Sequence, residues 1–142
     1  MHVRASRWLV FVSVGLLAIS ACARPGGAAD SDSTMVRVTL SEFKVASSLT
    51  AFRAGVPYRL TVDNRGQVNH EFLIVRPLGD DASREAVAEA TIVQIGELEL
   101  QPGAQRSITV TFPEAAPRGS LEFACQLPRH HEFGMHLAIT VQ

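Results

Sequence analysis

From Met35 onward the chain carries short runs in which apolar and polar side chains alternate, and this pattern constrains the fold more than any other feature. In residues 36–41, VRVTLS, every second side chain is apolar, as in a strand with one buried face. Further strand-like runs lie at residues 57–62, 71–75, 107–112, 120–125 and 136–141. Turn-forming residues separate these runs at 54–55, 63–66, 101–103 and 117–119. Several short strands with such spacing indicate an all-β, antiparallel sandwich or barrel.

One mid-chain segment departs from this pattern. Residues 80–95, DDASREAVAEATIVQI, begin with Asp and Ser, which cap helices, and continue with strong helix formers. We therefore expect one short helix around residues 83–90. The chain has 142 residues, which is enough for one domain, and it contains no internal repeat.

The N-terminal segment predicts an export signal. Arg4 and Arg7 form a positive region, and the apolar run 8–19 is too short to span a bilayer as an ordinary helix. Residues 19–22, ISAC, resemble a bacterial lipobox, in which Cys22 is acylated and becomes the first mature residue. The alternative is a plain secretory signal that is cut at a nearby small residue.

The segment between this signal and the first strand has nothing to bury. Residues 23–33, ARPGGAADSDS, are small and polar and predict a flexible tether. We therefore divide the chain into a lipoprotein signal peptide (1–21), a tether (22–34) and one folded domain (35–142). The expected product is exported and lipid-anchored to a cell-envelope membrane, with its domain facing the periplasm or the cell exterior.

The two cysteines and the charge balance narrow the classes of function. Two cysteines in an exported protein ordinarily form a disulfide, but a lipid on Cys22 leaves Cys125 alone. A lone thiol in an oxidising compartment is either buried and inert or engaged by a ligand. The net charge is −1, and no basic stripe indicates a nucleic-acid partner.

Residues 123–140 place a thiol, an imidazole and a thioether close together in the sequence: Cys125, His130 and Met135. A tight loop must join the strand that ends near Cys125 to the strand that follows Met135. His70, at the head of an apolar run, offers a second imidazole. Singly, His70 reads as an ordinary core or surface residue, Cys125 as a small buried hydrophobe and Met135 as packing. Together, a thiolate, imidazoles and a weak axial methionine are the ligands of a blue-copper electron-transfer site.

The chain resembles the cupredoxin family, the plastocyanin-like and azurin-like type 1 copper proteins. Residues 64–72 look like the family's first-ligand region, and residues 96–103 are similar to the plastocyanin-like branch. Residues 125–135 match the pattern Cys-x-x-Pro-Gly-His-x-x-x-Gly-Met except at one position. The resemblance covers most of the mature chain. It implies a Greek-key sandwich or barrel whose short helix lies in an excursion between the two halves.

The resemblance also implies a single type 1 copper that alternates between Cu(I) and Cu(II). The equatorial ligands would be His70, Cys125 and His130, and the axial ligand would be Met135.

Two positions call for comment within this pattern. Arg129 stands where glycine is usual, and if that glycine allows positive φ, arginine implies an altered loop or some strain. His131 follows the expected ligand His130, and the interval His131-x3-Met135 would permit His131 as the ligand instead, as in azurin-like proteins. The Cys-x4-His interval and Pro128 favour His130. By strand alternation, His136 should point away from the metal.

The function implied by the resemblance is single-electron transfer outside the cytoplasmic membrane. His130 would be the electron exit, with Pro128, Arg129 and Phe133 around it as a docking patch for redox partner proteins of the envelope. We expect no nucleic acid and no small-molecule substrate. The alternative is a copper-handling lipoprotein that carries or buffers copper, which the additional histidines near the site would suit.

Catalysis is not expected. Multicopper oxidases and copper nitrite reductases place histidines directly beside the type 1 cysteine, whereas Ala124 and Gln126 flank Cys125 here. A binuclear copper centre needs two cysteines in this loop, and the loop has one.

Overall fold

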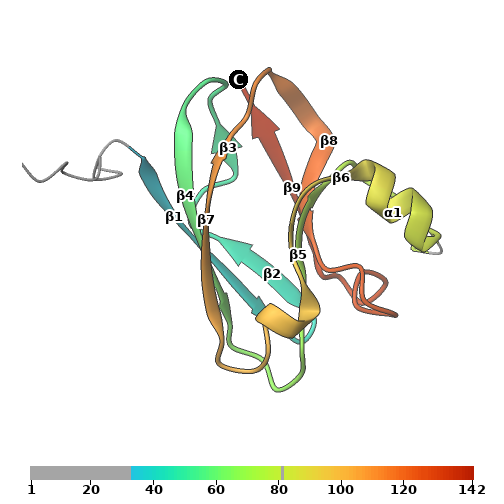
Figure 1. Ribbon diagram of the computed structural model, residues 1–142. Helices are drawn as coiled ribbons and strands as arrows, with labels where there is room; N and C mark the ends of the chain where they lie inside the picture. The colour runs from blue at the N-terminus through green and yellow to red at the C-terminus, as the bar shows by residue number, and fades with distance from the viewer. Residues whose placement is uncertain (1–32, 81) are drawn as a thin grey trace, which may run out of the picture.

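In the computed structural model, which describes residues 33–80 and 82–142, two β-sheets face each other and a short helix flanks one of them (Figure 1). The strands are β1 (Thr34–Ser41), β2 (Lys44–Ser47), β3 (Ala51–Phe52), β4 (Pro57–Asn64), β5 (Phe72–Val75), β6 (Thr91–Ile95), β7 (Gln105–Thr111), β8 (Ala116–Ala124) and β9 (His136–Val141). The helix α1 spans Arg84–Ala90, and a 3-10 turn, η1, spans Glu97–Glu99. The predicted all-β fold with one short mid-chain helix is confirmed.

The chain crosses between the two sheets rather than completing one before the other. The first sheet has the strand order β2-β1-β4-β7, and the second has the order β3-β9-β8-β5-β6. Most neighbouring strands are antiparallel, as predicted, but β1 pairs with β4 and β3 pairs with β9 in parallel. Parallel neighbours cannot be joined by a hairpin. The chain between the two members of each parallel pair passes through the opposite sheet, and both sheets are mixed.

The inward faces of the two sheets bury one apolar core. In β4 every second residue is buried, which agrees with the period-two pattern of its sequence. Phe52 of the edge strand β3 and Phe72 of β5 both pack on Phe123 of β8, with ring centroids 5.8 Å and 5.1 Å from it. Burying a side chain of this size stabilises the fold by about 1.5–3 kcal/mol. These contacts hold together the strands that carry the site.

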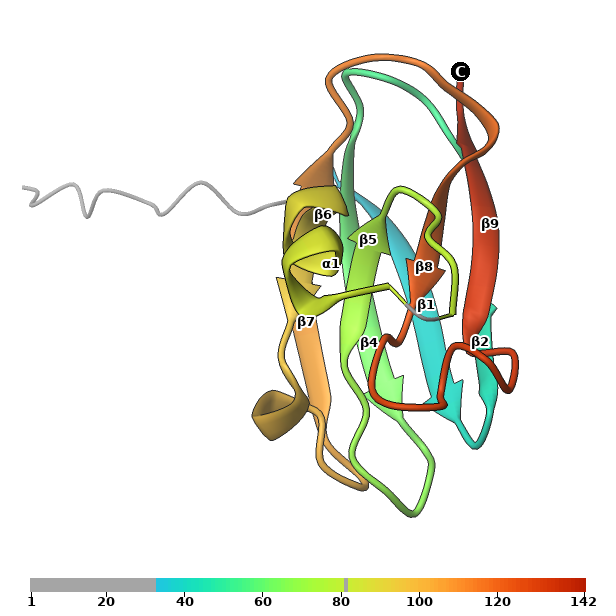
Figure 2. The same ribbon diagram turned by 90° about the vertical axis from the view of Figure 1, so that its right-hand side faces the viewer.

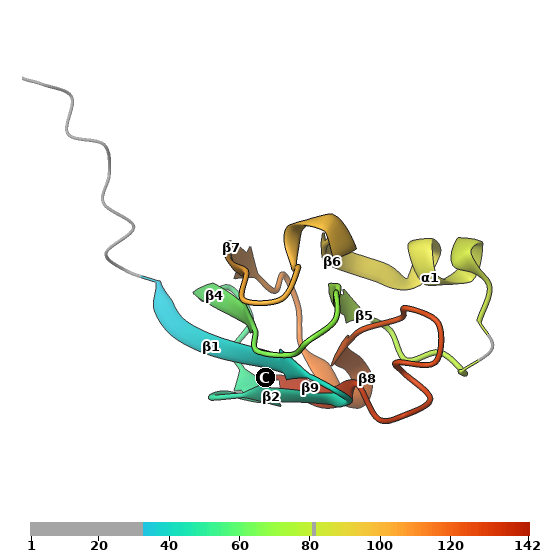
Figure 3. The ribbon, with the colours of Figure 1, turned by 90° about the horizontal axis from the view of Figure 1, so that it is seen from below.

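The helix α1 covers part of the outer face of the second sheet (Figure 3). Ser83 caps its N-terminus, where the hydroxyl oxygen accepts a hydrogen bond of 3.2 Å from the Ala86 N–H. Ala90, in the last turn, is buried in a second, smaller apolar cluster with Leu73 and Ala124 of the sheet. The predicted helix is confirmed at this position. The residues that follow it form β6 along the edge of the sheet.

The predicted signal peptide, Cys22 and nearly all of the tether lie outside the described residues. The first strand begins at Thr34, one residue before the predicted start of the domain. Within residues 33–80 and 82–142, no helix combines the length and the apolar character needed to cross a membrane.

Candidate metal centre

Strand ends meet at one end of the second sheet and bring two predicted ligands together. β5 and β8 pair so that Leu73 lies opposite Ala124, and β8 and β9 pair so that Ala124 lies opposite His136. The start of β5, the end of β8 and the start of β9 are therefore neighbours. His70 lies just before β5 and Cys125 just after β8. The topology thus explains why two residues so far apart in the sequence reach the same point.

The loop from β8 to β9 carries the two other predicted ligands, His130 and Met135. The Cys125 N–H donates to the Met135 carbonyl and the Met135 N–H donates to the His130 carbonyl, both at 3.0 Å, so the loop closes on itself. Met135 is fully buried. The loop lies at the lower end of the sandwich in Figure 2, near the turn between β1 and β2.

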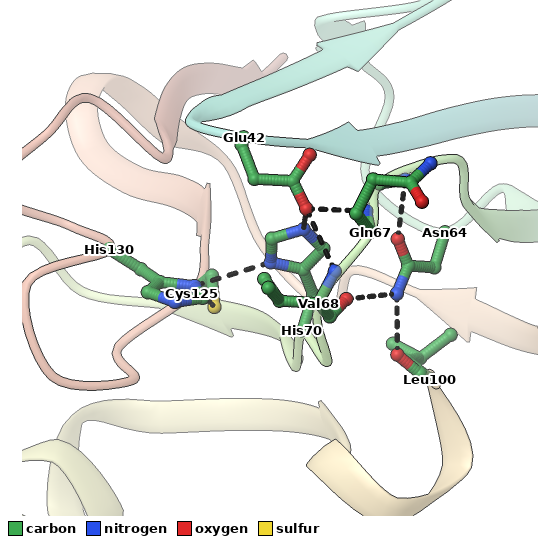
Figure 4. Close-up of polar contacts among 9 residues, drawn as sticks. Glu42, Asn64, Gln67, Val68, His70, Leu100, Cys125 and His130 are labelled. Atoms are coloured by element: carbon green, nitrogen blue, oxygen red, sulfur yellow. Dashed lines mark hydrogen bonds and ion pairs between the residues drawn. The ribbon is translucent and has the colours of Figure 1, made fainter. Parts of the chain in front are cut away.

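The ligand atoms of two imidazoles and one thiol converge. His130 Nδ1 lies 3.2 Å from His70 Nδ1 and 3.4 Å from Cys125 Sγ (Figure 4). All three atoms lie within 4.8 Å of one another. With metal–nitrogen bonds of about 2.0 Å and metal–sulfur bonds of about 2.3 Å, as at zinc sites, ligand atoms around one trigonal ion are roughly 3.5 Å apart. The cluster, with the buried thioether of Met135 on the same loop, therefore fits one copper ion.

Arg129 adopts the conformation that glycine would supply. Its φ is 72°, in the left-handed region, which costs a residue with a side chain about 1–2 kcal/mol. The Arg129 carbonyl accepts a hydrogen bond of 3.1 Å from the Phe133 N–H, and the guanidinium carbon lies 5.1 Å from the centre of the Phe133 ring. Of the two outcomes that arginine implied here, an altered loop or strain, the backbone shows strain, offset by these contacts.

Asn64 holds the segment that leads to His70. Its side chain is fully buried, and its Nδ2 donates to the carbonyls of Val68 at 2.9 Å and Leu100 at 2.7 Å. Its Oδ1 accepts from the Gly66 N–H at 2.8 Å. Because these bonds tie the end of β4 to the loop and to the residue that follows η1, Asn64 fixes the path of the backbone into the site (Figure 4).

Glu42, in the turn between β1 and β2, lies beside His70 Nε2, the ring nitrogen that does not face His130. Its Oε1 accepts from the backbone N–H groups of Gln67 at 2.6 Å and Val68 at 3.0 Å, and lies 3.5 Å from His70 Nε2. The ion-pair distance is met, but Nε2 makes no direct hydrogen bond, so the carboxylate acts on the ring chiefly through its charge. A Cβ at Gly66 would collide with the Glu42 carboxylate and with His70 Nε2, so this position requires glycine.

Burial sets the protonation of the three groups. Burial, followed by the charge of the neighbouring His130 ring, lowers the pKa of His70, and burial also lowers the pKa of His130. Both imidazoles are therefore neutral near pH 7 and can offer a lone pair. Burial raises the pKa of the Cys125 thiol to about 11. A metal ion must therefore displace the thiol proton, because the thiolate is the ligand.

His130 reaches the surface, whereas the other three predicted ligands are fully buried. The ring of Phe43 lies 5.2 Å from the His130 ring and 5.0 Å from the Phe133 ring, measured between centroids. Phe43 and Phe133 are 39% and 46% exposed. An apolar surface therefore surrounds the exposed edge of His130. We use the name His130 patch for Phe43, Pro128, Arg129, His130 and Phe133.

The neighbouring histidine, His131, belongs to a different cluster. Its Nδ1 lies 2.7 Å from Asp80 Oδ1 and its Nε2 lies 3.0 Å from Glu122 Oε1. Burial lowers the pKa of His131, but the contacts with Asp80 and Glu122 outweigh burial and the net shift is upward. His130 is thus the loop histidine that the structure brings to the thiol. The His136 side chain is 48% exposed and lies with His131.

Glu42, Phe43 and Glu71 are among the residues that shape the site but were given no role from the sequence. Glu71 Oε1 accepts a hydrogen bond of 3.0 Å from the Gln126 N–H, directly after Cys125. Glu42 and Phe43 come from a turn in the other sheet, and no local pattern in the sequence marks them. Only the folded arrangement brings that turn to the ligand loop.

Comparison with known proteins gives one relative among curated proteins. The chain is 35% identical over 120 residues to the copper-resistant cuproprotein CopI of Rubrivivax gelatinosus, a match that spans 79% of this chain and 68% of CopI. A comparison with models of protein families gives no match.

Several solved copper proteins share the fold. Auracyanin from the photosynthetic bacterium Roseiflexus castenholzii superposes with a TM-score of 0.57 at 22% identity, covering 78% of this chain and 98% of auracyanin. Rusticyanin from Thiobacillus ferrooxidans gives a TM-score of 0.56 at 16% identity, covering 77% and 78% of the two chains. A multi-copper oxidase from Pediococcus acidilactici gives a TM-score of 0.53 at 15% identity, covering 92% of this chain and 30% of the oxidase. At these identities the likeness concerns the fold alone.

Proposed function

Because the chain belongs to the cupredoxin family of copper proteins, we propose that it carries single electrons through one type 1 copper. His70, Cys125, His130 and Met135 would hold the copper. Bound copper supplies the Cu(I)/Cu(II) couple, and the protein supplies the ligand geometry and the apolar surroundings that set its potential.

The observation that carries this proposal is the arrangement of a compact, mostly buried ligand cluster with one histidine edge at the surface. His130 Nδ1 faces His70 and Cys125 at 3.2 Å and 3.4 Å, while its ring remains partly exposed. A buried ligand set that is already gathered needs little rearrangement when the charge of the ion changes. The exposed edge of His130 gives an electron a short path between the ion and a docked partner.

The His130 patch supports docking of a redox partner protein. Phe43 and Phe133 offer exposed aromatic surface, and Arg129 adds one positive charge above the Phe133 ring. Exposed aromatic and arginine side chains are the groups that protein interfaces favour.

We further propose that the protein is exported and anchored through a lipid on Cys22, with the domain outside the cytoplasmic membrane. This part rests on the sequence of the N-terminal segment. We propose no catalytic activity, because Ala124 and Gln126 flank Cys125 where oxidases of this fold need histidines for further coppers.

A second candidate function is copper handling, in which the protein carries or buffers the metal. The observation that favours it is the 35% identity with a protein named for copper resistance. In that case copper would leave the site readily when an acceptor is present.

Two measurements on the same copper-loaded protein separate the candidates. The reduced protein is mixed with a Cu(I) chelator and, separately, with oxidised cytochrome c. An electron carrier keeps its copper over many electron exchanges, whereas rapid loss of copper with sluggish electron exchange would favour copper handling.

Variants of the His130 patch test the docking surface. Phe133→Lys and Arg129→Glu should slow electron exchange without changing the copper content, because they alter docking and steering only. Met35→Lys replaces an exposed apolar residue at the far end of β1 and serves as the matched control. An equal effect of Met35→Lys would contradict a role for the patch.

A further inference from the structure

A second group of metal-ligating side chains lies on the outer face of the second sheet. Glu122 in β8 and His136 in β9 are close neighbours across the strand pair, and Glu122 alternates with the core residue Phe123. His131 joins them from the ligand loop. The adjacent residues His130 and His131 therefore belong to separate clusters, one at the end of the second sheet and one on its outer face.

The geometry of this outer cluster is compact. His131 Nε2 lies 3.0 Å from Glu122 Oε1, and His136 Nδ1 lies 3.7 Å from Glu122 Oε2. The two imidazole rings stack with centroids 4.6 Å apart and planes inclined by 24°. One ligand atom from each residue lies within 4.8 Å of the others. Glu122 is only 5% exposed, and its ion-pair partners are these two imidazoles.

Asp80 adds a feature that points to a cation. Its Oδ1 lies 2.7 Å from His131 Nδ1, so both ring nitrogens of His131 face a carboxylate oxygen. A neutral imidazole has a single N–H. If Nδ1–H donates to Asp80, Nε2 presents its lone pair towards Glu122, and two electron-rich groups then need a positive charge between them. A carboxylate behind the far nitrogen is the usual partner of a metal-bound histidine.

We propose that His131, His136 and Glu122 form a second metal site for a divalent ion, Zn(II) or Cu(II), separate from the type 1 centre. Imidazole and carboxylate ligands suit ions of this kind. A tetrahedral ion with bonds of about 2.0–2.2 Å has ligand atoms roughly 3.3–3.5 Å apart. The observed separations of 3.0 Å and 3.7 Å, one to each carboxylate oxygen of Glu122, lie on either side of that spacing. All three ligand atoms lie within 4.8 Å of one another, so side-chain shifts of about 1 Å or less would bring them to one ion.

Solvent has access to this site. The His136 side chain is about half exposed and opens the cluster to solvent. A pocket between α1 and the ligand loop borders Asp80 and His131, on the Nδ1 side of the His131 ring. Figure 3 shows α1 and the loop that follows β8 on the same outer side of the second sheet. An ion can therefore enter without opening the core or disturbing the buried type 1 ligands.

The test is a titration of the copper-loaded protein with Zn(II). Calorimetry measures the binding, and visible absorption monitors the type 1 copper. The site predicts saturable binding of one further equivalent with no change in visible absorption, because the type 1 copper stays in place. Repeating the titration with the Cys125→Ser variant keeps this result independent of the type 1 assignment, since the outer cluster does not contain the thiol.

Three variants locate the ion. His136→Ala removes a half-exposed ligand and should weaken Zn(II) binding by at least about 100-fold, and Asp80→Asn should weaken it by about 10–100-fold. Glu132→Gln removes an exposed negative charge from the same loop and is the matched control, with affinity unchanged within about twofold of wild type.

Absence of a further equivalent of Zn(II), or binding that His136→Ala leaves unchanged, would overturn the proposal. The cluster would then be explained by a doubly protonated His131 held between Asp80 and Glu122. Because His136 is half exposed and lies outside the apolar core, its replacement by alanine keeps the fold, so the variant gives a clear result.

Discussion

Replacing Asn64 by alanine tests whether one buried amide organises the approach to the metal centre. The variant loses two hydrogen bonds from Nδ2, to the carbonyls of Val68 and Leu100, and one to Oδ1 from the Gly66 N–H. A hydrogen bond contributes a net of about 0.5–1.5 kcal/mol, and a buried partner left without a bond costs about 1–3 kcal/mol. The expected loss in the free energy of unfolding is therefore about 3 kcal/mol, or roughly a 100-fold change in the folded-to-unfolded ratio.

The assay is urea unfolding of the copper-free protein, so that metal binding does not add to the measured stability. Thr61→Val is the matched control, because it removes one exposed hydroxyl contact of 3.1 Å with Ser107 from the same strand and keeps the shape of the side chain. Its cost should stay below about 1 kcal/mol. The Asn64→Ala variant should also bind copper more weakly, because the segment before His70 loses its anchor.

A loss below about 1 kcal/mol for Asn64→Ala, equal to that of the control, would refute this reasoning. It would mean that water or a shift of the loop satisfies the three partners, and that the path of the chain into the site does not depend on the amide.

Other substitutions and conditions have equally definite outcomes. Gly66→Ala should lower copper affinity, because the new Cβ collides with the His70 ring. Gly96→Ala should leave the affinity unchanged, because the nearest atom to its Cβ would be 3.8 Å away. Equilibrium dialysis with copper compares the two variants. In the copper-free protein, the thiolate absorbance of Cys125, taken as the difference from the Cys125→Ser variant, should grow with rising pH and reach half its limit near pH 11, since burial raises this pKa; a midpoint near 9 would show an exposed thiol. Ser83→Ala should cost about 1 kcal/mol in urea unfolding through loss of the α1 cap.

The alternation of apolar and polar residues predicts most strands, because a strand with one buried face has an apolar side chain at every second position. Residues 136–141 are predicted at the bounds that β9 has, and the helix at 83–90 follows from its cap and its composition. The strands β2, β3 and β6 were not predicted. β3 has only two residues, and in β6 the adjacent apolar residues Ile92 and Val93 break the alternation of the sequence. The parallel pairs depend on where the chain crosses between sheets, which no local pattern records.

In the site, too, contacts within one loop could be predicted from the sequence, whereas contacts set by the topology could not. Cys125, His130 and Met135 belong to one loop, so their spacing in the sequence already limits their spacing in space. Glu42 reaches the site from the first sheet, and Asp80 meets His131 across 51 positions of the sequence. Contacts of this kind follow from the topology and could not be read from the ligand loop itself.

The most direct test of the central claim is the visible absorption spectrum of the protein loaded with one equivalent of Cu(II). Because His70, Cys125 and His130 present two imidazoles and a thiol around one point, we predict intense visible absorption from charge transfer between the thiolate and Cu(II). The Cys125→Ser variant should lose this absorption, since a hydroxyl cannot replace the soft thiolate. A wild-type protein that binds the equivalent of copper and stays colourless would contradict the type 1 centre.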